Sequence, residues 1–150
     1  SDITIKKVEP PKEFKVGDSI TAGDFKWKVT KWSKKTEIGE YILNSFMGKK
    51  ANGEFLILDV EVESVGKSAK YLSDSYIKLI DDQKREFSAD TMAAIYLKPQ
   101  GSSLAFEQLN PGVKKKGKVV YDVPKGLKVV NVKITSGLFS NKIYTVKLIG

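Results

Sequence analysis

Three carboxylates occur at alternate positions within one largely apolar segment, at Asp59, Glu61 and Glu63. In an extended strand, alternate residues share a face and lie about 7 Å apart, so these carboxylates would form a single row. Such a row could hold a calcium ion or supply a general acid and a general base. It is also the ordinary pattern of a solvent-facing sheet, in which lysines on neighbouring strands pair with the carboxylates. Because lysine is abundant in this chain, we favour the paired, solvent-facing arrangement.

A second acidic group comprises Asp81 and Asp82, with Asp74 and Asp90 nearby in the sequence. Together they could form a calcium site in a loop, but the D-x-D-x-D-G spacing of calcium loops is absent. Aspartate is also a preferred residue of tight turns. We therefore interpret Asp81-Asp82 as a hairpin turn.

The densest run of positive charge comprises Lys114, Lys115, Lys116 and Lys118. It could dock on teichoic acid, phospholipid or nucleic acid, although a solvated hairpin is the more ordinary interpretation. Alternation along residues 25–32 places Trp32 on the lysine side of its strand. We therefore take these four lysines and Trp32 as the candidate contacts for an anionic surface.

Aromatic side chains could also form a flat platform for a sugar or a base, with Trp27, Trp32, Tyr41 and Phe46 as its members. A sandwich of this size needs large side chains between its sheets. We therefore expect Trp27 at least to lie in the core.

Composition excludes several classes of chemistry. The 150-residue chain has no cysteine and no histidine, which excludes disulfides, zinc–thiolate sites and Ser-His-Asp triads. No glycine-rich phosphate loop occurs either. We expect no enzyme activity, cofactor or metal site. The formal net charge is +8, yet Arg85 is the only arginine, so sequence-specific reading of nucleic acid is not expected.

The strand that must position the carboxylate row is residues 55–65. Leu56, Leu58, Val60 and Val62 alternate with the carboxylates, which is the pattern of a strand with one buried face. Phe55 and Ile57 make the opposite face apolar near the start, so a further segment should cover that end.

The rest of the chain predicts an all-β protein. Short alternating segments separated by turn residues, with no long amphipathic helix, indicate an antiparallel β-sandwich of two sheets. One short helical turn is expected near residues 90–97. Residues 33–53 show little periodicity, with a loop at 48–53. Residues 1–13 are expected to be a linker or an edge strand, and residues 14–150 one domain. No apolar run is long enough for a membrane helix, and the chain opens without a signal segment.

Several motifs resemble the family called domain of unknown function 4352. The resemblance rests on Val16-Gly17-Asp18, on residues 21–25 and 48–60, on the hairpin at 77–82, and on residues 106–112 and 117–124. Together these motifs cover roughly residues 16–135. The family also carries the label telomeric-repeat-binding-factor-like, which the single arginine gives an independent reason to set aside.

The resemblance implies an immunoglobulin-like β-sandwich from a secreted or lipid-anchored prokaryotic protein, similar to mycobacterial secreted antigens. It implies no catalytic residues. We therefore expect a non-catalytic, extracellular or surface-anchored domain that serves protein interaction, adhesion or ligand capture at the cell envelope, with an unidentified partner. The alternative is a module that binds an anionic polymer through its lysines, weakly and in a salt-sensitive manner.

Overall fold

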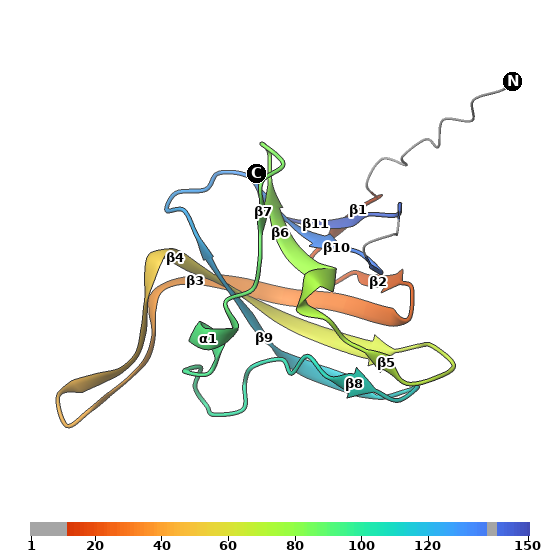
Figure 1. Ribbon diagram of the computed structural model, residues 1–150. Helices are drawn as coiled ribbons and strands as arrows, with labels where there is room; N and C mark the ends of the chain where they lie inside the picture. Colours follow the sequence, from red (N-terminus) through yellow and green to blue (C-terminus); the bar gives the residue numbers. More distant parts are fainter. Residues whose placement is uncertain (1–11, 138–140) are drawn as a thin grey trace, which may run out of the picture.

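Two β-sheets face each other in the computed structural model, which describes residues 12–137 and 141–150 (Figure 1). One sheet has five strands in the order β1-β11-β10-β6-β7, and the other has four in the order β2-β3-β4-β9. Strands β5 and β8 form a small two-stranded sheet. Neighbouring strands are antiparallel except β1 and β11, which are parallel. The predicted all-β, immunoglobulin-like sandwich is confirmed.

The elements follow one another with few helical residues. In chain order they are β1 (Lys12–Lys15), β2 (Ser19–Ala22), β3 (Phe25–Ile42), β4 (Ser45–Ser64), β5 (Lys70–Tyr71), the 3-10 helix η1 (Asp74–Tyr76), β6 (Ile77–Asp81), β7 (Glu86–Phe87), α1 (Thr91–Ala94), β8 (Gln108–Leu109), β9 (Lys114–Val123), β10 (Val130–Ile134) and β11 (Tyr144–Ile149). The short helix α1 confirms the helical turn expected near residues 90–97. Of the segment expected to be a linker or an edge strand, residues 1–11 lie outside the described residues, and the remaining two belong to the edge strand β1.

The main core lies between the two large sheets, and β4 supplies its centre. Leu56, Leu58, Val60 and Val62 are all buried, in one cluster with Trp27 and Tyr121. The alternation seen in the sequence therefore assigns the buried face of this strand correctly. Trp27, the largest of these side chains, is fully buried, as expected for a residue between the sheets.

A second apolar cluster covers the opposite face of β4 at Phe55 and Ile57. Its other members come from β3, β9 and the helical segment: Ile38, Val120, Ala93, Ala94 and Leu97. Asp90 is the N-cap of α1: its side-chain Oδ1 accepts a hydrogen bond from the Ala93 N–H at 2.9 Å. The expectation that a further segment covers this end is confirmed.

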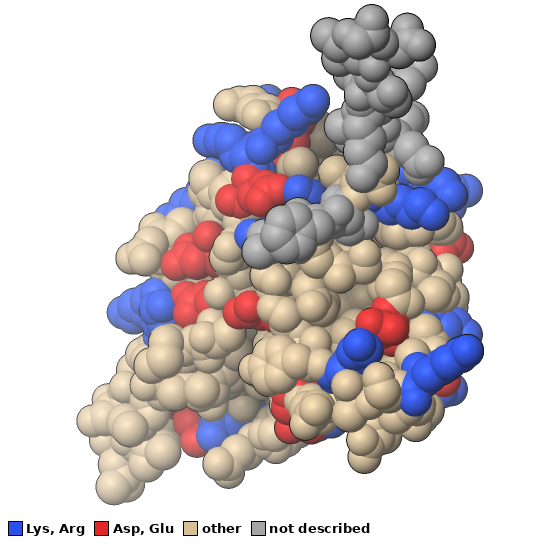
Figure 2. All heavy atoms as spheres, turned by 45° about the vertical axis from the view of Figure 1, so that its right-hand side comes forward, with Lys and Arg blue, Asp and Glu red and all other residues tan. Residues whose placement is uncertain are grey.

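The structure corrects the interpretation of residues 33–53. β3 and β4 are long strands that pair with each other as far as Ile42 and Ser45, so residues 48–53 are strand rather than loop. Leu43 and Asn44 alone form the turn, with positive φ angles of 49° and 65°. Two-residue turns of this kind usually carry Asn-Gly, so Leu43-Asn44 gave no turn signal in the sequence. We call residues 37–50 the arm; it extends away from the sandwich at the lower left (Figures 1 and 2).

Trp32 also lies elsewhere than predicted. The register between β3 and β4 shifts between Val29 and Lys31, which is the effect of one extra residue in β3. The shift exchanges the two faces of the following residues, so Trp32 lies opposite Leu58 and packs, partly buried, against the main core. The prediction that Trp32 lies on the lysine side of β3 is therefore wrong.

Candidate functional site

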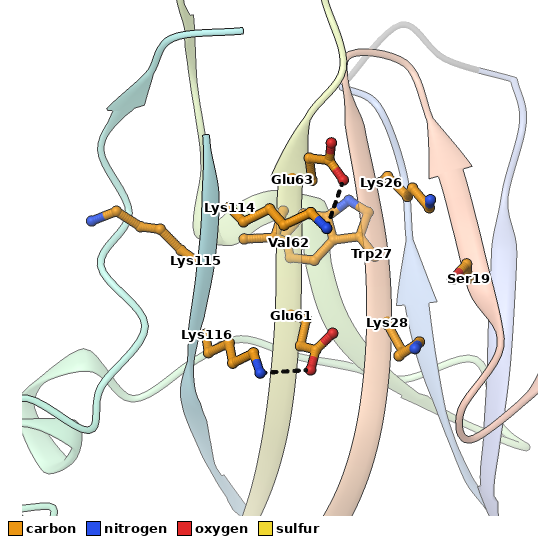
Figure 3. Close-up of a pocket in the computed structure, with 10 residues that line it drawn as sticks. All are labelled: Ser19, Lys26, Trp27, Lys28, Glu61, Val62, Glu63, Lys114, Lys115 and Lys116. Carbon is orange, nitrogen blue, oxygen red and sulfur yellow. Dashed lines mark ion pairs between the residues drawn. The ribbon is translucent and has the colours of Figure 1, made fainter. Parts of the chain in front are cut away.

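The carboxylate row of β4 lies between two rows of lysines. Glu63 is opposite Lys26 on β3 and Lys114 on β9, and Glu61 is likewise opposite Lys28 and Lys116. Figure 3 shows these two sets crossing the sheet side by side. Asp59 continues the pattern one step further along. We call this surface the lysine face; it comprises Lys26, Lys28, Lys31, Asp59, Glu61, Glu63, Lys114, Lys116 and Lys118.

Ion pairs join the carboxylates to the lysines of β9. Lys114 Nζ lies 3.7 Å from Glu63 Oε1, and Lys116 Nζ lies 3.4 Å from Glu61 Oε1. Lys118 Nζ is closer to its partner, at 2.5 Å from Asp59 Oδ1. The side chains of Lys114 and Lys116 are 74% and 80% exposed, so their ion pairs contribute little stability and leave both ammonium groups open to solvent.

The lysines of β3 add positive charge that is not matched in this way. Within residues 12–137 and 141–150, no ion pair joins Lys26, Lys28 or Lys31 to a carboxylate. Six lysines thus surround three carboxylates. The lysine face carries an excess of positive charge that can attract a polyanion.

The structure separates the four lysines that the sequence groups together. They belong to strand β9 rather than to a solvated hairpin, and alternate side chains point to opposite faces. Lys114, Lys116 and Lys118 therefore lie on the lysine face, whereas Lys115 points away and pairs with Glu107 (Figure 3). The lysines of β3 were not among the predicted site residues, because the sequence shows their alternation but not their pairing with the carboxylates of β4.

The acidic residues at Asp81 and Asp82 form a turn. The Asp81 carboxylate accepts the backbone N–H groups of Gln83 and Arg85 at 3.0 and 2.8 Å, and Arg85 Nε at 2.6 Å. Burial acts to raise the pKa of Asp81, but the hydrogen bonds from Arg85 and Gln83 outweigh it and hold the pKa below its usual range. The hairpin interpretation of Asp81-Asp82 is confirmed by these contacts.

Cavities near the carboxylates are small or wide open. A pocket of about 120 Å³ lies at the lysine face, well below the volume of ordinary small-molecule sites. A larger depression of about 670 Å³ is open to solvent and contains Asp90 and Asp122. Asp90 pairs with Lys49 at 2.7 Å, and Asp122 accepts the N–H groups of Asn52 and Gly53. These carboxylates do not converge on a common point.

Metal-binding clusters and membrane helices are both absent from the described residues. In that part of the chain, no three acidic side chains are grouped closely enough to hold a metal ion. The helices described there include none long and apolar enough to cross a membrane.

The fold and the lysine face define an all-β sandwich domain with a basic, open sheet surface. The sequence model of DUF4352, a domain of unknown function, matches residues 14–145, and the chain belongs to this family. The resemblance stated from the sequence motifs is thereby confirmed. No curated protein matches the sequence.

Solved structures share the fold at low sequence identity. The yjhA protein from Bacillus subtilis is 23% identical, with a TM-score of 0.65, over 89% of this chain and 98% of that chain. The secreted protein MPT63 from Mycobacterium tuberculosis is 14% identical, with a TM-score of 0.62, over 93% and 98%. The ycdA protein from Bacillus subtilis, named as a lipoprotein, is 15% identical, with a TM-score of 0.61, over 91% of this chain and 39% of that chain.

Proposed function

We propose that the chain is a non-catalytic binding module of the cell envelope whose lysine face binds anionic polymers. The observation that supports this most strongly is the arrangement of six lysines around three carboxylates on one open sheet. An envelope location is supported by the secreted protein and the lipoprotein among the structures of the same fold. Interaction with an envelope protein, or adhesion, remains the broader expectation from the sequence.

The shape of the lysine face suits a long polymer better than a reactive small molecule. Catalysis needs a site that excludes water and holds the substrate in a fixed position. The lysine face is an open sheet with only a small pocket, and its carboxylates pair with the lysines of β9. The chain also has no histidine, the commonest general base near neutral pH, and no cysteine nucleophile.

The spacing of the lysines suits a repeating anion. Alternate residues of a strand lie about 7 Å apart, and β3 and β9 lie on either side of β4, about 10 Å from each other. Two parallel rows of ammonium groups can therefore contact successive phosphates or sulfates of a chain such as poly(glycerol phosphate). Lysine acts as a point charge in such contacts, so the binding should be tolerant of polymer sequence.

Retention on immobilised poly(glycerol phosphate) tests this proposal. The variant Lys26→Gln/Lys28→Gln/Lys31→Gln removes three charges from the lysine face. A control variant, Lys67→Gln/Lys125→Gln/Lys128→Gln, removes the same charge from exposed lysines elsewhere. We expect the first variant to elute at clearly lower salt than wild type, and the control to elute close to wild type. Equal losses in both variants would show that net charge alone drives retention and would refute the proposed site.

A further inference from the structure

The arm stands apart from the body of the sandwich. Pairing between β4 and β9 ends at Glu54 and Val123, so β3 and β4 pair only with each other over residues 37–50. Figure 1 shows this ribbon extending well beyond the sheet to which its strands belong. Beyond its base, where Ile38 is buried, it is a two-stranded projection whose end is exposed.

The end of the arm is apolar on both faces. Tyr41 and Phe46 face each other across the ribbon, with ring centroids 5.2 Å apart. Ile42 and Met47 lie on the opposite face, and Leu43 occupies the turn. Leu43 is 95% exposed, and Tyr41, Ile42 and Met47 are each exposed by about half or more. No charged residue occurs from 41 to 48, and the end of the projection in Figure 2 shows neither acidic nor basic side chains.

Specific contacts hold the arm in place. At its base, Ile38 is buried in the second apolar cluster, and Lys98 Nζ pairs with Glu40 Oε1 at 3.0 Å. Between these contacts, Gly39 and Gly48 lie opposite each other, and a Cβ at 48 would lie 2.1 Å from the Ile38 carbonyl oxygen, so the two strands approach more closely there than a side chain would allow. The apolar end is therefore presented on an ordered ribbon, which reduces the entropy cost of binding.

We propose that the end of the arm inserts into the interfacial region of an anionic lipid bilayer. A flat protein surface would cover one face of the ribbon, whereas a bilayer surrounds both faces and the turn. Glu40, the first charged residue on the β3 side of the turn, is three residues from Leu43, about 10 Å along the strand. This length of uncharged strand matches the depth of about 5–10 Å to which apolar faces enter the headgroup boundary. Tyr41 and Phe46 are residue types suited to that boundary.

Charge favours the same orientation. Lys49 and Lys50 follow the apolar end on the side of the sandwich; Lys49 pairs with Asp90, Lys50 is exposed, and the chain as a whole carries a net charge of +8. Each lysine near an anionic membrane surface adds attraction that salt weakens. Shallow insertion also keeps the outward N–H and C=O groups of the ribbon near water and headgroups, where they can be hydrogen-bonded.

Vesicle co-sedimentation tests the contribution of the apolar end. Vesicles of equal phosphatidylglycerol and phosphatidylcholine are compared with vesicles of phosphatidylcholine alone. The test variant, Leu43→Asn/Met47→Gln, removes two apolar side chains without a change of charge, and asparagine tolerates the positive φ at 43. The control, Val65→Ser/Val113→Ser, removes two exposed apolar side chains outside the arm. We expect about a tenfold loss of partitioning in the test variant only. Equal binding of the test variant and wild type would overturn the proposal.

A fluorescence measurement locates the insertion. Because the chain contains no cysteine, Leu43→Cys and Val65→Cys each provide a single site for the environment-sensitive dye NBD. On addition of anionic vesicles at 0.5 M salt, we expect a blue shift at 43 and none at 65. The lysine-face variant, Lys26→Gln/Lys28→Gln/Lys31→Gln, should keep this shift, which separates insertion from polymer binding. A blue shift at 43 that appears without vesicles and grows with protein concentration would show that the end of the arm binds a second copy of the chain. No shift at all would exclude insertion. Either result overturns the proposal.

Discussion

The Tyr121 hydroxyl donates a hydrogen bond of 2.8 Å to the Ile77 carbonyl oxygen and so joins the two sheets of the sandwich. Tyr121 lies on β9 and Ile77 begins β6 in the opposite sheet. Both side chains are fully buried. Burial raises the pKa of Tyr121, and the negative charge of Asp74 acts in the same direction, so the phenol remains a donor at all ordinary pH values.

Tyr121→Phe should reduce the free energy of unfolding by about 1–2 kcal/mol. The change removes the donor but keeps the ring, so it leaves a buried carbonyl oxygen with one hydrogen bond fewer. Urea unfolding measures the effect, with Tyr144→Phe as a control at a partly exposed tyrosine. Equal stability of Tyr121→Phe and wild type would mean that the bond between the sheets contributes nothing.

Leu58→Ala should destabilise the domain by about 2–5 kcal/mol. Leu58 is fully buried in the main core, and its truncation removes apolar burial and leaves a cavity. Thermal or urea unfolding measures this loss. A change below about half a kcal/mol would show that the assigned face of β4 is incorrect.

Leu43→Asn should stabilise the arm. Leu43 has a φ of 49°, a conformation that costs a β-carbon-bearing residue about 1–2 kcal/mol but that asparagine adopts more readily. Hydrogen exchange of the arm amides should slow, while amides of the main core should keep their protection. Faster exchange in the arm would indicate that the Leu43 side chain supports the turn through contacts.

Loss of stability in acid should depend on Asp81. Its folded pKa lies below the ordinary value of 3.8, so the unfolded state binds more protons and stability rises with pH through this range. The contribution is fully present above about pH 5 and is lost as the pH falls through the lowered pKa. Asp81→Asn should therefore destabilise the domain at pH 7 and have little effect near pH 2. The neighbouring change Asp82→Asn serves as the control, and a pH-independent effect of Asp81→Asn would contradict the prediction.

Glu86 and Asp90 should contribute to the same acid transition. A hydrogen bond from Lys133 is the largest influence on Glu86 and lowers its pKa. Burial acts to raise the pKa of Asp90, but the Lys49 hydrogen bond and the N–H groups at the start of α1 lower it overall.

Polyanion binding should be strongly dependent on salt. Contacts between lysine and phosphate release counterions, so the affinity for poly(glycerol phosphate) or DNA should largely disappear between about 50 and 200 mM salt. Removing the three β3 lysines should reduce the slope of log affinity against log salt by about two to three, since each lysine that pairs with a phosphate adds about one to it. Isothermal titration at several salt concentrations measures this slope. An affinity that persists at 200 mM salt and is lost on Trp32→Ala would instead indicate a dedicated aromatic site.

The sequence alone determined the fold class and the buried face of the central strand. Leu56, Leu58, Val60 and Val62 alternate with three carboxylates, and one-sided burial imposes such an alternation directly on a strand. The apolar residues Phe55 and Ile57 also indicated that a further segment covers this strand. Both inferences succeed because they depend only on local periodicity and on the need to bury apolar side chains.

The tertiary structure decided which residues share a surface. Lys118 meets Asp59 only through the register of β4 with β9, and one extra residue in β3 turns Trp32 from the lysine side to the core. Pairing between distant strands is set by the combined packing of both sheets, and a single-residue shift exchanges every following side chain between faces. The arm was not predicted, for a related reason. Most of its side chains face solvent on both sides, so burial imposes no alternation on them, and Leu43 is not a residue type that marks a turn.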